Sequence, residues 1–262
     1  MPTLTLPTGA DLEAAWRKAV APYQQSVTWR SWLQVANSVL PYAGCWLAAY
    51  LLLDVSFTLA MAMCVLAAGF LVRVFIIHHD CGHGSFFRSQ WANDLIGYIT
   101  GVLTFTPYHQ WRYEHATHHA TSGDLDRRGV GDISTMTVRE YREAHGWKRL
   151  GYRVYRNPLV LFLLGPLVHF IILHRFPWRG KARRERWSIH ATNFALAALI
   201  GGLIWAMGWK AYLAIQLPFM FVAFSCGVWL FYVQHQFEET YWEYHPQWDF
   251  TSAGMRGCTF YD

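Results

Sequence analysis

Two short clusters of histidines are the residues of this sequence best suited to chemistry. The first, His79–His83, has the spacing HxxxH, and the second, His115–His119, has the spacing HxxHH. Side chains three or four positions apart lie on one face of a helix, so each cluster should aim its imidazoles in one direction. Imidazole is a neutral ligand for first-row transition metals. The pattern predicts a metal site with five ligands: His79, His83, His115, His118 and His119.

The number of imidazoles bears on the identity of the metal. Structural zinc takes four ligands and catalytic zinc three, often including cysteine or a carboxylate. Five imidazoles are too many for one tetrahedral ion, and Cys81, the only cysteine in either cluster, has the wrong spacing to join such a set. Two metal ions fit the number better, and iron suits imidazole ligands and oxygen chemistry. A lone histidine would more often be a hydrogen-bonded interfacial residue, but five at helical spacing favour a metal site.

Other polar residues near the clusters are expected to support the ligands rather than bind metal. Carboxylates commonly orient metal-bound imidazoles, and the candidates for this outer layer are Asp80, Glu114, Asp124 and Asp126, together with His109. His78 should point away from the face shared by His79 and His83. The histidines without a partner at ligand spacing are expected to be structural: His145, His169, His174, His190 and His245.

The composition places these clusters in a membrane protein. Of the 262 residues, 53% are hydrophobic and only 15% charged, whereas soluble domains carry about 25% charged residues. The net charge of +5 does not indicate nucleic-acid binding, because the basic residues flank apolar runs, as they do in cytoplasmic loops. The five cysteines form no CxxC pair, which favours a reducing compartment.

Two apolar hairpins are expected to position the clusters. Charge-free runs cover residues 31–53 and 55–72, and then residues 187–209 and 211–237; a helix needs about 20 apolar residues to cross the hydrocarbon core. Basic residues flank the outer ends of both hairpins, so these ends should face the cytoplasm. The sequence predicts an all-α integral membrane protein with about four spans. His235 lies where the last run ends, which makes it a candidate sixth ligand.

The remaining segments are expected to lie at the membrane surface. Residues 95–108 are too short to span, and residues 157–174, which contain two prolines, should dip into the membrane and return, since a full crossing would place His235 opposite the clusters. The polar loop 123–155 should cap the site on the cytoplasmic side. Residues 1–30 are read as a cytoplasmic leader and residues 1–262 as a single domain. The basic stretch Arg175–Arg186 is either a topology signal or a site for anionic head groups.

Three segments carry a resemblance to a known family. HDCGHGSFF, residues 79–87, resembles the first histidine box of the membrane fatty acid desaturases. HATHHATSGDLDRRGVGD, residues 115–132, is similar to the second box and following segment of bacterial acyl-lipid desaturases. QHQFE, residues 234–238, resembles a further segment whose histidine is assigned to the metal site. The resemblance runs from about Arg73 to the end of the chain.

The resemblance implies a di-iron centre, dioxygen as co-substrate, and electrons from a ferredoxin or cytochrome b5-type protein. It implies removal of two hydrogens from adjacent methylenes of a lipid acyl chain, nearest to the delta-12 or omega-6 group. The expected location is a bacterial inner membrane, with the boxes on the cytoplasmic side. An unactivated methylene needs a strong metal–oxygen oxidant, so the protein's part is positioning and exclusion of water.

The sequence departs from the family pattern in one respect. The pattern has a third HxxHH-type box after the His235 segment, whereas only His245 follows His235 before Asp262. We therefore expect a truncated form that lacks the ligands of that box, binds iron poorly and is inactive.

Other functions stay open at this point. A lipid hydroxylase or carotenoid oxygenase has similar boxes, although the similarity around residues 119–132 favours a desaturase. A non-enzymatic membrane metal-binding or transport protein would place histidines or carboxylates within the spans. Here they gather at the span ends, which argues against that class.

Overall fold

The computed structural model describes residues 15, 17–177 and 182–259. Residues 1–14 and 16 of the predicted leader, residues 178–181 of the basic stretch and residues 260–262 lie outside the described residues. Within the described ranges every regular element is a helix, and β pairing is limited to an isolated bridge between Asp124 and Glu243. The prediction of an all-α protein is confirmed.

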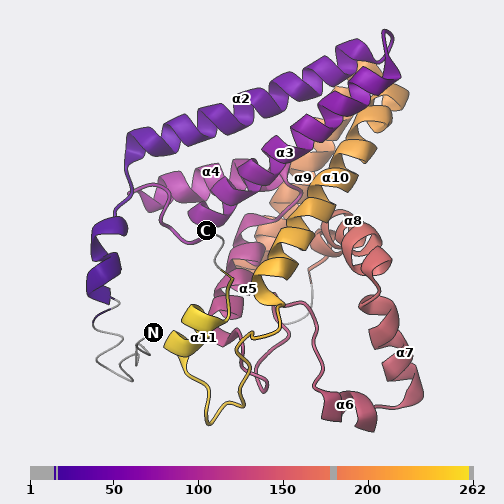
Figure 1. Cartoon of the computed structure of the whole chain (residues 1–262). Helices are drawn as coiled ribbons and strands as arrows, with labels where there is room; N and C mark the ends of the chain where they lie inside the picture. The colour runs from indigo at the N-terminus through magenta and orange to yellow at the C-terminus, as the bar shows by residue number, and fades with distance from the viewer. Residues whose placement is uncertain (1–14, 16, 178–181, 260–262) are drawn as a thin grey trace, which may run out of the picture.

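Two helical hairpins form the long axis of the molecule (Figure 1). The first consists of α2 (Thr28–Leu52) and α3 (Phe57–Gly82), and the second of α9 (Arg183–Met207) and α10 (Trp209–His235). Each of these four helices is long and apolar enough to cross a membrane, which confirms the prediction of about four spans. The turns of both hairpins lie at the same end of the molecule (Figure 1).

The centre of the bundle is the contact of α3 with α10. α3 presents small buried side chains, including Cys64, Ala67 and Ala68, and α10 presents Phe219 and Phe224. Small residues let helices approach closely, which matters in a membrane, where burial of apolar surface gives little driving force between spans. The outward surface is apolar as well, which suits contact with lipid.

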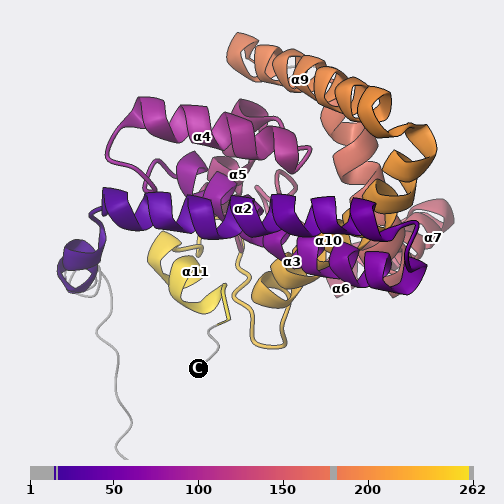
Figure 2. The same cartoon turned by 90° about the horizontal axis from the view of Figure 1, so that it is seen from above.

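Two shorter helices lie at the end of the bundle opposite the hairpin turns. α4 (Gln90–Leu103) begins at Ser89, whose side chain accepts a hydrogen bond from the amide of Ala92. α5 (Tyr108–Thr121) begins directly after Pro107, a residue that suits the start of a helix because it lacks an amide hydrogen. Seen from above, α4 and α9 lie on the same side of α2, and α11 (Phe250–Arg256) lies on the other (Figure 2).

The segment predicted to dip into the membrane is an irregular helix. It comprises η2 (Val160–Leu164), α8 (Gly165–Leu167), η3 (Val168–Ile172) and η4 (Leu173–Arg175). It meets α7 (Gly146–Tyr155) at an angle of 62°, a bend that suits either a broken span or a re-entrant loop. The dip therefore stays a prediction. Before α7, α6 (Val138–Glu143) is held by a capping box between Thr137 and Glu140.

Candidate metal centre

The ends of α3 and α5 bring the two histidine clusters together. α3 continues through the first cluster to Gly82, with His83 as its capping residue, so His79 and His83 are one turn apart. The hydroxyl group of Tyr108, at the start of α5, donates a buried hydrogen bond to the carbonyl oxygen of Cys81 at 2.8 Å. This contact fixes α5 against the end of α3, and the two clusters consequently face each other.

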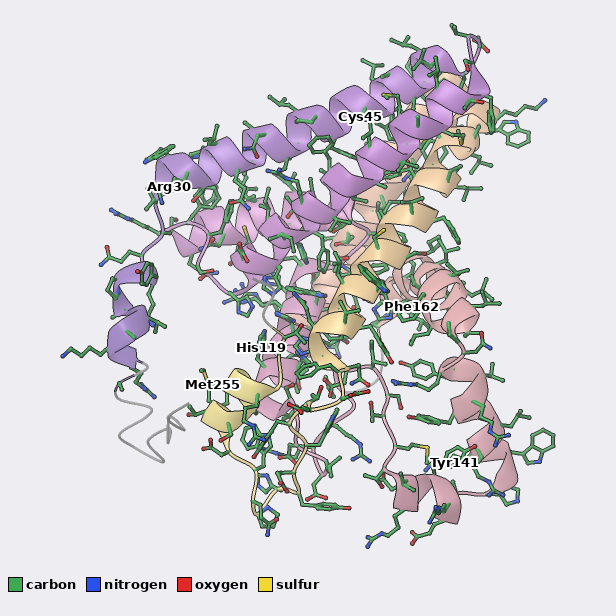
Figure 3. All side chains as sticks on the ribbon, viewed as in Figure 1. Arg30, Cys45, His119, Tyr141, Phe162 and Met255 are labelled. Carbon is green, nitrogen blue, oxygen red and sulfur yellow. The ribbon has the colours of Figure 1, made fainter. Side chains whose placement is uncertain are left out.

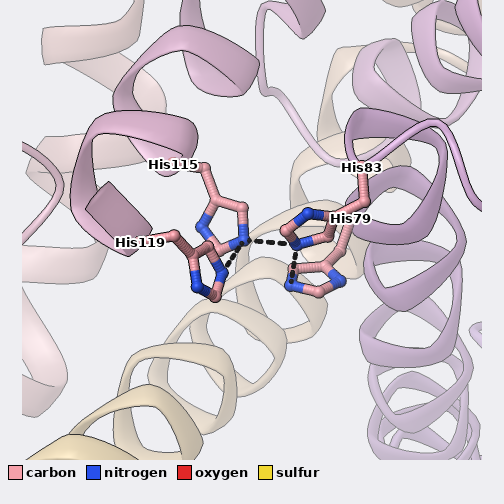
Figure 4. Close-up of side chains that lie close together, drawn as sticks. All are labelled: His79, His83, His115 and His119. Carbon is pink, nitrogen blue, oxygen red and sulfur yellow. Dashed lines mark hydrogen bonds between the residues drawn. The ribbon is translucent and has the colours of Figure 1, made fainter. Parts of the chain in front are cut away.

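Four imidazoles converge between the two helices (Figure 4). The Nε2 atom of His83 lies 3.3 Å from Nε2 of His79 and 3.0 Å from Nε2 of His115. The Nε2 atom of His115 also lies 3.0 Å from Nε2 of His119. One ring nitrogen from each of these four residues lies within 4.8 Å of the others.

These separations match the spacing of ligands around one metal ion. Two nitrogens about 2.1 Å from the same ion are about 3.0 Å apart at a right angle and about 3.4 Å apart at the tetrahedral angle. Hydrogen bonding alone explains the arrangement poorly, because a neutral Nε2 atom has either one proton or one lone pair. His83 and His115 would each have to satisfy two neighbours with it. The donor set fits a metal ion.

The surroundings keep the imidazoles neutral, as metal binding requires. Burial lowers the pKa of His115 to about 2, and the neighbouring imidazoles add to this effect. The pKa of His119 is lowered to about 4 for the same reasons. The pKa of His83 is also lowered, chiefly by burial and then by His79. At neutral pH these side chains therefore offer lone pairs rather than positive charge.

Two neighbouring side chains hold the rings in place. Nδ1 of His79 lies 2.9 Å from a carboxylate oxygen of Asp80, the position expected of an orienting carboxylate. The indole ring of Trp111 stacks on His115, with ring centroids 4.4 Å apart and an angle of 15° between the planes. Sequence reasoning missed Trp111, although its spacing of four residues from His115 places both on one face of α5.

His118 forms a separate pair with His235 instead of joining the four. Their ring centroids are 4.9 Å apart, whereas those of His118 and His115 are 6.1 Å apart. Nε2 of His118 is buried and has no hydrogen-bond partner among the described residues. Buried polar atoms nearly always have a partner, so this nitrogen is suited to a metal ion. The two rings line a cavity of about 20 Å³.

The six predicted ligands thus form a group of four and an adjacent pair. The two groups meet where His118 of the pair lies beside His119 of the group of four, with ring centroids 5.5 Å apart. His119 lies far from the hairpin turns (Figure 3). Cys45, on α2, lies nearer to those turns. The group of four could hold one metal ion, and the His118–His235 pair lies beside it.

Asp132 is a site residue that sequence reasoning did not single out. Its carboxylate bonds Nδ1 of His118, and its other oxygen accepts a hydrogen bond from the amide of Gly129 at 3.0 Å. Gly131 has a φ of +75°, and a Cβ atom there would lie 2.8 Å from the carbonyl oxygen of Glu114. A glycine suits this position, because the loop passes close to α5 with a positive φ just before Asp132.

Two of the predicted outer carboxylates lie elsewhere. Asp124 is fully buried and contacts Nδ1 of His245 at 2.8 Å and Nε of Arg127 at 2.5 Å. Asp126 accepts a hydrogen bond from the amide of His245 at 3.0 Å. These carboxylates fasten the segment after His235 to the loop after α5. We expected these carboxylates to orient ligand histidines, but they contact His245 instead. The reason is that the segment after His235 returns across the loop that follows α5.

Three other residues also have defined places. His78 is buried, with Nδ1 2.9 Å from the carbonyl oxygen of Gly97, and it points away from the four histidines as expected. Glu114 accepts a hydrogen bond from the side chain of Gln110 at 3.3 Å. His109 lies beside α9, where its amide donates a hydrogen bond to Ser188. His109 therefore lines a different surface from the metal centre.

Comparison with known proteins identifies similar chains. The profile of the family described as fatty acid desaturase matches residues 56–261. A fatty acid desaturase from Bacillus subtilis is 45% identical over 258 residues, which cover 98% of this chain and 73% of the relative. An sn-1 oleoyl-lipid 12-desaturase from Picosynechococcus is 29% identical over 76% of this chain and 51% of its own length. An sn-1 acyl-lipid omega-3 desaturase (ferredoxin) from Synechocystis is 31% identical over 70% of this chain and 52% of its own length. The chain therefore spans about half the length of these two cyanobacterial relatives.

Proposed function

We propose, from the premise that this chain belongs to the fatty acid desaturase family, that it serves to insert a double bond into the acyl chain of a membrane lipid. The convergence of four histidine nitrogens from α3 and α5 is the observation that carries the proposal. The substrate class is supported by the relatives, which are named for oleoyl-lipid and acyl-lipid substrates. The overall change takes two hydrogens from adjacent methylenes and reduces dioxygen to two waters with two electrons and two protons.

The proposed ligands divide between two iron ions. His79, His83, His115 and His119 would hold one, and His118 and His235 belong to the second. When bound with dioxygen, the iron pair supplies the oxidising power that an unactivated C–H bond requires. Asp80 and Asp132 fix the Nδ1 atoms of His79 and His118, so that each ring turns its Nε2 atom toward the site. Burial of His118 limits access of water to the pair.

The electron donor and the location follow from the same premise. One relative is named as a ferredoxin-dependent enzyme, which favours a ferredoxin as the donor, with a cytochrome b5-type protein as the alternative. The four spans place the protein in a membrane, and we assign the bacterial inner membrane. The basic residues before α2 and α9 support the proposal that the histidine groups lie on the cytoplasmic side.

The test is lipid analysis of a bacterial host that makes oleoyl lipids but no dienes. The chain is expressed with a ferredoxin and its reductase, and its iron content is measured after purification. His115→Ala removes a ligand, and His190→Ala is the matched control, because His190 is exposed on α9. A diene that forms with the parent chain and the control but not with His115→Ala is the expected result.

Two outcomes would contradict parts of this proposal. An iron-loaded chain that leaves acyl chains unchanged, or that yields a hydroxylated lipid, would rule out desaturation. A purified chain that retains no iron and forms no diene would contradict the assignment of the histidine groups to a metal centre.

A further inference from the structure

A groove lies between α4, α5 and the first turns of α9, apart from the metal centre. Its volume is about 610 Å³, and its lining includes Tyr98, His109, Arg183, Arg184, Trp187 and Ala191. Ligand pockets commonly have volumes of about 300–1,000 Å³. None of the six predicted metal ligands lines the groove. Because α5 contributes to both sites, the groove lies at the same end of the spans as the histidines.

The mouth of the groove is positively charged. Arg184 contacts Asp94 at 3.1 Å, and the other carboxylate oxygen of Asp94 lies 3.2 Å from Arg112, so two guanidinium groups neutralise one carboxylate. Arg183 has no ion-pair partner among the described residues and is exposed. Glu185 is the other carboxylate nearby. Arg183 and Arg184 also form the first turn of α9, where backbone amides favour an anion.

One wall of the groove is aromatic, and the ring of His109 offers one further hydrogen-bond donor beside it. Trp187 is 62% exposed, although it lies on a helix long and apolar enough to cross a membrane. The amide of His109 donates to Ser188 Oγ at 3.0 Å, which fixes this turn of α5 against α9. The ring nitrogens of His109 make no hydrogen bond to the described residues. The groove thus joins a cationic mouth to an apolar wall.

We propose that this groove binds a glycerophospholipid, with the phosphate against Arg183, Arg184 and His109 and the first acyl carbons against Tyr98 and Trp187. Only an amphiphile matches both parts, because a free phosphate would leave the aromatic wall facing water and a neutral lipid would leave Arg183 without a counter-charge. Basic pockets beside membrane spans are suited to lipid head groups. The inference concerns binding and stands apart from the proposed function.

The test uses the full chain in phosphatidylcholine vesicles that contain phosphatidylglycerol with a photoreactive group near the glycerol. After illumination, labelled positions are located by peptide mass spectrometry. We expect labelling concentrated on Tyr98 and Trp187, and competition by unlabelled phosphatidylglycerol but not by diacylglycerol or inorganic phosphate. Arg183→Gln should lower labelling about fivefold, as expected for one basic residue worth about 1 kcal/mol at an anionic surface.

Arg139→Gln is the control, since Arg139 is an exposed arginine of α6 away from the groove. Equal labelling along the apolar faces of α2 and α9, unchanged by Arg183→Gln, would show non-specific lipid contact and overturn the proposal. Competition by inorganic phosphate would show a site for soluble anions, and equal competition by diacylglycerol would show that the phosphate is not recognised. Because no readout depends on desaturation, these failures are distinct from failure of the proposed function.

Discussion

Asp132 bonds Nδ1 of His118 from the loop after α5, while Nε2 of the same ring is buried without a partner among the described residues. The carboxylate accepts a hydrogen bond from Nδ1–H, so the tautomer it favours keeps the proton on Nδ1 and has a lone pair on Nε2. The ring is therefore held ready to bind a metal ion, although α5 and the loop approach each other only in the folded chain.

Asp132→Asn should weaken iron binding at the His118–His235 pair by about 10- to 100-fold, as is typical when an outer carboxylate is removed. The amide can turn its NH2 group toward Nδ1 and then favours the wrong tautomer of His118. The measurement is iron retained per chain after dialysis against a graded chelator. Glu143→Gln, at an exposed carboxylate of α6, is the control. Equal retention in both variants would show that Asp132 does not support a ligand.

Gly82→Ala should destabilise the protein, because the new Cβ atom would lie 2.7 Å from the ring of Trp111. Overpacking of this kind costs about 1–3 kcal/mol, and it would also displace the indole from His115. Gly69→Ala in the same helix has open space around the new Cβ atom, so it should be neutral or stabilising by up to about 1 kcal/mol. Thermal unfolding in detergent compares the two variants, and similar midpoints would contradict the close packing of Gly82 and Trp111.

Features set by neighbouring residues could be predicted from the sequence, whereas contacts between distant segments could not. The spans were predictable because lipid demands long apolar runs, and His115 and His119 were predictable as partners because a four-residue step turns a helix by only about 40°. His118 and His119 are adjacent, so they point about 100° apart, and this separation assigns His118 to the other pair. The spacing rule alone did not distinguish the two groups.

The contacts missed from sequence depend on how distant segments return. Asp132 reaches His118 through a loop in which Gly129 and Gly131 adopt positive φ angles. Asp124 meets His245, which lies 121 residues further along the chain. No local pattern indicates which histidine a carboxylate will face after such a return.

The pairing of Asp124 with His245 should make the attachment of residues 236–249 sensitive to acid. Burial alone would raise the pKa of Asp124, but hydrogen bonds from Arg127, His245 and the amide of Asp126 outweigh burial and lower it. A lowered carboxyl pKa contributes its full stabilisation above the ordinary carboxyl pKa of 3.8, and the stabilisation is lost as the pH falls through the folded-state pKa.

Amide hydrogen exchange across this pH range, corrected for intrinsic rates, should therefore show residues 236–249 loosening before α3. Asp124→Asn should show the loosened segment already at neutral pH, with little further change on acidification. Asp54→Asn, at the tip of the first hairpin, should behave as the parent chain. Exchange in Asp124→Asn that matches the parent at neutral pH would mean that the carboxylate does not hold this segment.

α7 should lie along the membrane surface. Trp147, Leu150 and Val154 share one face and are 77%, 49% and 52% exposed, while Lys148 and Arg153 flank that face. A basic helix with an exposed apolar face is suited to the interface between head groups and acyl chains. The 62° bend into the apolar segment 160–175 also suits a helix that follows the surface before the chain dips inward.

A spin label at Trp147→Cys, in a variant with its native cysteines replaced, measures this placement in lipid vesicles. The label should be accessible to oxygen and poorly accessible to a water-soluble nickel chelate. A label at Glu143→Cys on α6 should show the reverse, because α6 is short and strongly charged. High accessibility to nickel at both positions would place α7 in water as part of a projecting cap. In that case its apolar face would need a protein partner, since three exposed apolar side chains on one face are costly to leave hydrated.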